Sequence, residues 1–166
     1  MTSSATQDTA TSSYSSEEAP RPVVIAQPHD GVPVRAFGNE IVFKLGSHQS
    51  DGALVVGLAT VPAGNAVPMH VQDSEDELFL ILDGTYRFWV NESTTDVGSG
   101  ALVFVPRGAP HKFQVLGERA GRHWVVGLPG GFDGFFQEAA ELFTAPEGPD
   151  VSRLVALNAK YGYRFV

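Results

Sequence analysis

The sequence contains no cysteine, which excludes disulfide bonds, iron–sulfur clusters, thiolate metal sites and cysteine nucleophiles. It also contains no run of about 18 apolar residues, so no membrane span is expected. Basic residues are scarce: 11 Lys and Arg stand against 19 Asp and Glu, which gives a formal net charge of −8. Because nucleic-acid binding requires a basic surface, that balance argues against nucleic acid as a partner. Glycine-rich phosphate loops and the nucleophile elbow of hydrolases are missing as well.

The length of 166 residues and the apolar fraction of 43% fit one globular domain with a packed core. The N-terminal segment differs from the rest, because Ser, Thr and Ala dominate residues 1–18. This composition predicts a disordered tail over residues 1–20. The segment has neither the positive start nor the apolar stretch of a secretory signal, so we expect a cytoplasmic protein.

Residues 21–128 carry the pattern of an all-β domain. Short runs rich in β-branched residues alternate with Gly, Pro, Asn and Asp. Strands are predicted over residues 23–25, 34–36, 41–45, 54–61, 77–82, 85–90, 101–105, 111–116 and 123–128. Asp83-Gly84 between two of these runs predicts a tight hairpin. Many short strands separated by turns indicate a sandwich or a barrel, and the lack of an internal repeat indicates only one.

Residues 129–166 are predicted to form a helical extension. Apolar residues from 132 to 143 recur at helical spacing, and Asp133 is placed to cap the start of that helix. A second helix is predicted over residues 151–160, with Asp150 as its N-cap and Gly162 just past its end. The phenylalanines of the first helix would bury its amphipathic face.

Four polar residues carry the candidate chemistry. His70 and Gln72 are two positions apart, so in a strand their side chains share one face. Glu77 opens the next strand, and His111 opens a later strand after a proline-containing corner. In a closed barrel these side chains can converge. Two histidines and one carboxylate are the set that binds divalent iron and similar metals and leaves positions open for substrate. Each histidine taken alone would more often be an ordinary core or surface residue.

Strand alternation also predicts a substrate pocket beside these residues. The candidate lining residues are Met69, Phe79, Ile81, Phe113 and Val115. All but Met69, which is expected near the mouth, share the parity of Glu77 or His111. An apolar pocket with a few convergent polar groups is the usual form of a small-molecule site. The alternative is that these side chains simply fill the barrel.

The spacing of these residues resembles the two motifs of the cupin superfamily. Gly64, His70, Glu77 and Gly84 fit the first motif, G-x5-H-x-H-x(3,4)-E-x6-G, over residues 64–84. In that motif the second histidine is here Gln72. The resemblance implies a single jelly-roll-type cupin barrel and a small-molecule partner. It leaves the reaction open, because this fold supports many chemistries.

The second motif, G-x5-P-x-G-x2-H-x3-N, fits Gly100, Pro106, Gly108 and His111, and its final Asn is here Val115. The resemblance implies that His70, Glu77 and His111 are metal ligands. Gln72 leaves three readings open: it ligates through its amide oxygen, it hydrogen-bonds substrate or metal-bound water, or it marks a site that has lost its metal and kept a pocket.

The stretch at residues 128–136, with its Pro-Gly-Gly-Phe turn and following phenylalanines, is similar to single-domain bacterial cupins of the quercetin 2,3-dioxygenase-like group. That similarity implies an oxygenated aromatic or polyketide-like substrate from secondary metabolism. It also implies nickel, manganese, iron, cobalt or zinc as cofactor, with Glu77 as the catalytic group that takes the proton of a substrate hydroxyl. Two other functions stay open: a non-oxidative cyclase, isomerase or lyase, and a binding protein without catalysis. Cupins often pair through a sheet edge, so a homodimer is expected, with strands around Val23 and Val34 crossing over.

Overall fold

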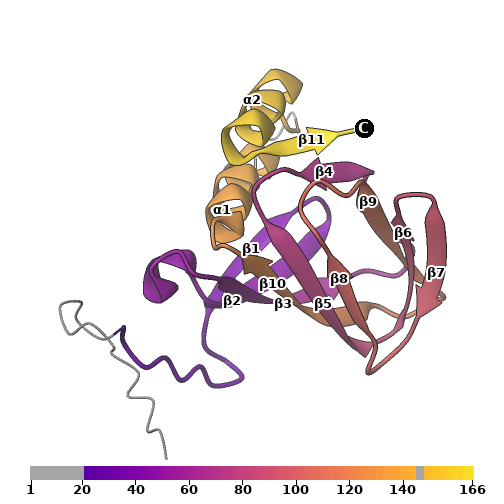
Figure 1. The fold of residues 1–166 in the computed structure, drawn as a ribbon, viewed down its shortest axis with the longest axis horizontal. Helices are drawn as coiled ribbons and strands as arrows, with labels where there is room; N and C mark the ends of the chain where they lie inside the picture. The colour runs from indigo at the N-terminus through magenta and orange to yellow at the C-terminus, as the bar shows by residue number, and fades with distance from the viewer. Residues whose placement is uncertain (1–20, 145–147) are drawn as a thin grey trace, which may run out of the picture.

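The computed structural model describes residues 21–144 and 148–166. The tail predicted for residues 1–20 lies outside the described residues. The described chain forms two antiparallel β-sheets that face each other, with two helices at one end of the barrel (Figure 1). This is the all-β barrel with C-terminal helices that the sequence predicts. Neither helix has the length and apolar character that crossing a membrane requires.

The strands alternate between the sheets along much of the chain. The first sheet has the order β1 (Val32–Ala36), β2 (Asn39–Leu45), β3 (Val55–Val61), β10 (Gly121–Leu128), β5 (Asp76–Asp83) and β8 (Leu102–Val105). The second has the order β11 (Tyr163–Phe165), β4 (His70–Gln72), β9 (His111–Leu116), β6 (Thr85–Val90) and β7 (Ser93–Val97). A short 3-10 helix, Ser47–Ser50, follows β2. Alternate residues of each central strand face the space between the sheets, where the core lies.

The hairpin predicted at Asp83-Gly84 is wrong. β5 pairs with β10 and β8 in the first sheet, whereas β6 pairs with β9 and β7 in the second. Both sides of β5 are already occupied, so β6 has no edge to join, and the two residues instead carry the chain between sheets. Gly84 has a φ of 89°, and a side chain there would lie 2.9 Å from Gly121 Cα. The glycine therefore serves a close backbone approach.

Other strand predictions need correction. Residues 23–25 form no strand and lie exposed, because they pair with no strand of the described chain. The strands β7 and β11 were not predicted, and β4 was anticipated only from the shared face of His70 and Gln72: β4 and β11 have three residues each, and β7 is exposed and polar. Such segments carry too little apolar alternation to be recognised from sequence.

The C-terminal extension consists of α1 (Phe132–Phe143), α2 (Val151–Tyr161) and β11. The predicted caps of α2 are confirmed, because Asp150 accepts hydrogen bonds from the backbone of Ser152 and Arg153, and Gly162 has a left-handed φ of 73°. Asp133 does not cap α1: its carboxylate accepts a hydrogen bond from the backbone of Ser47 at 2.9 Å.

After α2 the chain returns to the barrel and adds β11 to the edge of β4, with Tyr163 opposite Gln72 and Phe165 opposite His70. Phe135 of α1 stacks on Tyr163 with ring centroids 4.2 Å apart. Figure 1 shows α1, α2 and β11 gathered beside β4 at one end of the barrel. The extension therefore covers the end of the barrel to which β4 brings its polar residues.

Gly121 on β10 packs tightly against Tyr86 in the core of the barrel. A Cβ at this position would lie 2.4 Å from the hydroxyl of Tyr86, which is fully buried. We expect Gly121→Ala to lower the free energy of unfolding by about 2–3 kcal/mol, because the phenol ring has no room to move. Gly98→Ala is the matched control, since nothing lies within 4 Å of its added methyl group. Urea denaturation of both variants checks the prediction, and equal stabilities would contradict it.

Candidate metal centre

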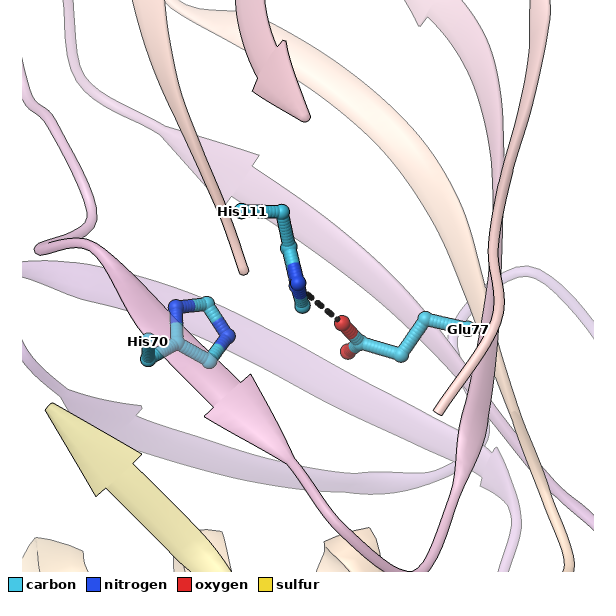
Figure 2. Close-up of side chains that lie close together, drawn as sticks. All are labelled: His70, Glu77 and His111. Atoms are coloured by element: carbon cyan, nitrogen blue, oxygen red, sulfur yellow. Dashed lines mark hydrogen bonds and ion pairs between the residues drawn. The ribbon is translucent and has the colours of Figure 1, made fainter. Parts of the chain in front are cut away.

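Three side chains that are far apart in the sequence converge inside the barrel. His70 of β4 lies directly opposite His111 of β9, and their ring centroids are 4.1 Å apart. Glu77 reaches them from β5 in the other sheet, and its Oε2 lies 2.8 Å from Nε2 of His111. Figure 2 shows the three side chains pointing toward one another. Their ligand atoms all lie within 4.8 Å of one another, close enough to share one metal ion.

The orientation of both imidazoles is fixed by the backbone. Nδ1 of His70 donates to the carbonyl of Pro68, and Nδ1 of His111 donates to the carbonyl of Ala109, both at 2.9 Å. A carbonyl only accepts hydrogen bonds, so Nδ1 carries a hydrogen in each ring. Nε2 is therefore the nitrogen left to bind a metal, and such outer hydrogen bonds typically hold metal-binding histidines in place.

Burial and mutual charge set the protonation of the cluster. Burial alone would raise the pKa of Glu77, but the hydrogen bond from His111 and the charges of both histidines lower it below its ordinary value. Burial alone would lower the pKa of His111, but the hydrogen bond to Glu77 and its charge raise it. Burial and the neighbouring His111 lower the pKa of His70. The carboxylate is thus kept ionised, and one imidazole is kept neutral, as metal ligands must be.

Gln72 lies in the same place but has no partner. It is 3% exposed, and neither its amide oxygen nor its amide nitrogen makes a hydrogen bond within residues 21–144 and 148–166. A buried polar group left unsatisfied costs about 1–3 kcal/mol. The side chain of Gln72 lines the same cavity as His70 and Glu77 and helps to lower the pKa of the Glu77 carboxyl, so its amide oxygen fits a metal held there as a fourth ligand. The donor set therefore suits a divalent ion, with Gln72 the weakest of its members.

Substitutions of Gln72 should separate stability from metal binding. Gln72→Leu should raise the free energy of unfolding of the metal-free protein by about 1–2 kcal/mol, because it removes two unsatisfied polar atoms. The same change should weaken metal binding, whereas Gln72→His should strengthen it by about tenfold or more, because imidazole is the better ligand. Urea denaturation in EDTA and metal titration measure the two effects. Gln137→Leu on the exposed face of α1 is the control, and unchanged metal affinity in both Gln72 variants would place its side chain away from the ion.

A cavity of about 70 Å³ opens beside the cluster. His70, Gln72 and Glu77 contribute to its wall, which is otherwise mostly apolar. Aromatic side chains of α1 and β11 close it, namely Phe132, Phe135, Phe136, Tyr163 and Phe165. The C-terminal extension is therefore part of the site.

The predicted pocket residues divide into two groups. Phe79 and Phe113 line the cavity. Ile81, Val115 and Met69 do not. Ile81 and Val115 are 1% and 0% exposed and fill the barrel instead, as the alternative reading held. Met69 lies just before β4 and is half-buried.

The composition of the acidic run Asp73, Glu75 and Asp76 suggests a solvated turn, and Asp73 is exposed, but Glu75 departs from this expectation. Glu75 is buried, accepts a hydrogen bond from the backbone of Phe132 at 2.8 Å, and accepts another from the hydroxyl of Tyr163 at 3.3 Å. It thus satisfies the first turn of α1 and ties it to β11. Burial raises the pKa of Glu75 to about 7. The neighbouring Asp76 pairs with Arg107, whose guanidinium lowers the pKa of Asp76 to about 2.

His123 and Tyr163 also line the cavity, and sequence analysis assigned neither to the site. His123 matches no motif position, and its role depends on which strands flank β10. Tyr163 reaches the site only because β11 pairs with β4. For His123 the alternation with Val125 was a usable signal, since both lie on the inward face of a central strand.

The chain therefore folds as a two-sheet β-barrel whose buried His-His-Glu cluster is a candidate metal site. The Cupin_2 family model, described as Cupin domain, matches residues 57–126, which include all four candidate ligands. This match and the structural neighbours support the cupin superfamily that the two motifs indicate. The quercetin dioxygenase-like group remains a prediction.

The individual comparisons are more distant. An uncharacterized protein of Streptomyces coelicolor is 33% identical over 63 residues, which are 38% of this chain and 59% of that protein. The chain thus matches about three-fifths of the length of this relative. KdgF from Halomonas sp. is similar with a TM-score of 0.60 and 12% identity, over 68% of this chain and 98% of that one. A predicted oxalate decarboxylase from Thermotoga maritima is similar with a TM-score of 0.59 and 19% identity. The similarity covers 64% of this chain and 99% of that one. At these identities the solved structures establish the fold alone.

Proposed function

We propose that this chain is a metal-dependent cupin enzyme that acts on a small oxygenated aromatic or polyketide-like molecule. The observation that carries the proposal is a buried His-His-Glu cluster, two of whose members, His70 and Glu77, line a mostly apolar cavity. Polar groups that converge in an apolar pocket are typical of small-molecule sites. The perturbed pKa values of His70, Glu77 and His111 add support, since such shifts cluster at functional sites.

Each residue has a part in this proposal. A divalent ion held by the two histidines, Glu77 and Gln72 would bind and polarise an oxygen of the substrate. Glu77 would accept the proton of a substrate hydroxyl at its carboxylate, which the neighbouring histidines keep ionised by lowering its pKa. Phe79 and Phe113 would hold the ring of the substrate. The aromatic cover from α1 and β11 would keep water out.

The most concrete form of the proposal is a quercetinase-like ring-opening dioxygenase. The cavity volume limits its substrate, because pockets that bury drug-sized ligands have about 300–1,000 Å³, against about 70 Å³ here. A compact oxygenated aromatic compound therefore fits better than a flavonol, which would require the cover of α1 and β11 to move.

Metal analysis and oxygen uptake test the proposal together. The purified protein should retain one metal ion per chain after it is supplied with nickel, manganese, iron, cobalt or zinc and then dialysed. The loaded protein should consume oxygen with a compact catechol or hydroxypyranone, and less or none with a flavonol. A protein that retains none of the five metals is not the enzyme proposed.

Gln72 favours a second candidate, a non-oxidative cyclase, isomerase or lyase. Where the cupin motif has a second histidine, this chain offers a neutral amide, which is a poorer metal ligand. Turnover of the same compounds without oxygen uptake would favour this candidate. Ligand binding without turnover under any of these conditions would instead indicate a binding protein.

We also propose that the protein is a homodimer. β1 is an edge strand, and the arm before it exposes Val23 and Ile25 by 88% and 78%. Exposed apolar side chains and an open sheet edge in one chain favour a second copy of the chain as their cover. Sedimentation should give a dimer that Val23→Ser/Ile25→Ser dissociates. A single species of 17.7 kDa for the unmodified protein would contradict the proposal.

A further inference from the structure

His123 is a buried histidine that the proposed metal site does not use. It lies on β10 between β3 and β5, opposite Ala59 and Ile81. Glu77 lies opposite Gly127, four residues further along β10, so the two rows are about 13 Å apart along the strands. Both His123 and Glu77 nevertheless line the same cavity. The cavity therefore has a polar group deeper in the barrel as well as the metal cluster.

Tyr86 holds His123 in one orientation. The hydroxyl of Tyr86 lies 2.9 Å from Nδ1 of His123, and the two residues are 0% and 2% exposed. Phe79 and Phe113, which also line the cavity, each lie 5.5 Å from the imidazole between ring centroids. The ring is thus packed on its sides and hydrogen-bonded at Nδ1. Among residues 21–144 and 148–166 it makes no hydrogen bond through Nε2.

The tautomer of His123 follows from the partner of Tyr86. Burial raises the pKa of the Tyr86 phenol, so its hydroxyl keeps its hydrogen. Within the described residues Nδ1 is the one partner of that hydroxyl, and a buried hydroxyl hydrogen is satisfied when it is donated. Nδ1 therefore accepts, and Nε2 carries the hydrogen of the neutral ring. His123 offers a single uncharged N–H donor to the cavity.

We propose that Nε2 of His123 is a second polar contact for the ligand, one that donates a hydrogen bond to an acceptor oxygen at the end of the molecule away from the metal ligands. The cavity then takes a compact aromatic molecule with oxygen at both ends, whose ring lies against Phe79 and Phe113. This inference rests on the small-molecule site of the proposed function and specifies its substrate class. It does not require the metal, so metal-free protein can test it.

The competing explanation is that Tyr86 and His123 only fill the core as a satisfied polar pair. Single substitutions leave one partner unsatisfied and test stability as much as binding. The double variant Tyr86→Phe/His123→Phe removes both polar groups and keeps two aromatic rings of similar size. Tyr86→Phe alone is the matched control, because it removes the internal hydrogen bond and keeps the imidazole at the cavity wall.

Phenol and toluene are the probes, because they differ by a hydroxyl in place of a methyl group. Their affinities for the full-length, metal-free protein should favour phenol in the wild type. In the double variant the ratio of phenol affinity to toluene affinity should fall about tenfold, which is the upper range for one hydrogen bond. Tyr86→Phe should keep most of it. The inference is wrong if the double variant has the wild-type preference, or if the wild type binds no phenol.

Nitrogen NMR of ¹⁵N-histidine-labelled protein distinguishes a ligand contact from a purely structural role. If His123 only fills the core, its Nε2 resonance should not respond to phenol. The Nε2 resonance of His123, assigned by its loss in the double variant, should shift when phenol is added and stay in place with toluene. A resonance that phenol leaves unmoved overturns the inference. Metal affinity should be equal in the wild type and the double variant. Failure of the metal-dependent function would instead appear as a wild type that retains no metal.

Discussion

Replacing Glu77 by glutamine is expected to weaken divalent-metal binding by at least about 100-fold while the protein stays folded. Loss of an outer-shell partner already costs about 10- to 100-fold, and Glu77 is the charged ligand itself. The shape of the side chain is kept, and the new amide can donate to Nε2 of a neutral His111. Isothermal titration with nickel, manganese and zinc, together with elemental analysis after dialysis, measures the effect.

His111→Ala is also expected to lose the metal. Unlike Glu77→Gln, it should also destabilise the folded protein. It leaves the Glu77 carboxylate buried without its 2.8 Å partner, and an uncompensated buried charge costs about 3–5 kcal/mol. Its weaker metal binding would therefore come with a lower free energy of unfolding, which Glu77→Gln should largely avoid. His48→Ala, at the exposed position of the 3-10 helix, is the control and should retain the metal. Wild-type metal affinity in Glu77→Gln would exclude Glu77 as a ligand.

Much of the barrel follows from local patterns. Alternation of side chains along a strand predicts which residues share a face, and it places His70 with Gln72 and Glu77 with Phe79. The end caps of α2 are predicted for the same reason, since Asp150 and Gly162 act on their own neighbours. What local pattern does not give is the partner of each strand. The Asp83-Gly84 turn has hairpin composition, yet β10 and β8 occupy both edges of β5.

The site residues that sequence analysis missed depend on contacts between distant segments. Glu75 reads as part of a charged turn, and its burial depends on α1 and Tyr163, which lie 57 and 88 residues further along the chain. His123 is an ordinary strand residue until β10 is placed between β3 and β5. The motif spacing succeeds where these fail, because it encodes the barrel geometry that brings His70, Glu77 and His111 together.

Acid is expected to destabilise the protein through His123. Burial lowers the pKa of His123 to about 4, against its ordinary value of 6.5. As pH falls below 6.5 the unfolded chain binds a proton at this position before the folded protein does, so the free energy of unfolding decreases. The decrease continues until the folded protein also binds the proton near pH 4, and it amounts to about 3 kcal/mol over this interval.

The double variant Tyr86→Phe/His123→Phe isolates this contribution from that of the metal ligands. His70 and Glu77 also favour unfolding in acid, because the folded state lowers the pKa of each, but they are present in both proteins and cancel in the difference. Urea denaturation from pH 7.5 to pH 4 should therefore give curves that run parallel above pH 7. Below pH 6.5 the wild type should lose stability faster, by up to about 1.4 kcal/mol per pH unit. Parallel curves over the whole range would mean that the folded protein protonates His123 as readily as the unfolded chain. A neutral donor at the inner end of the cavity would then exist only above the ordinary pKa of histidine.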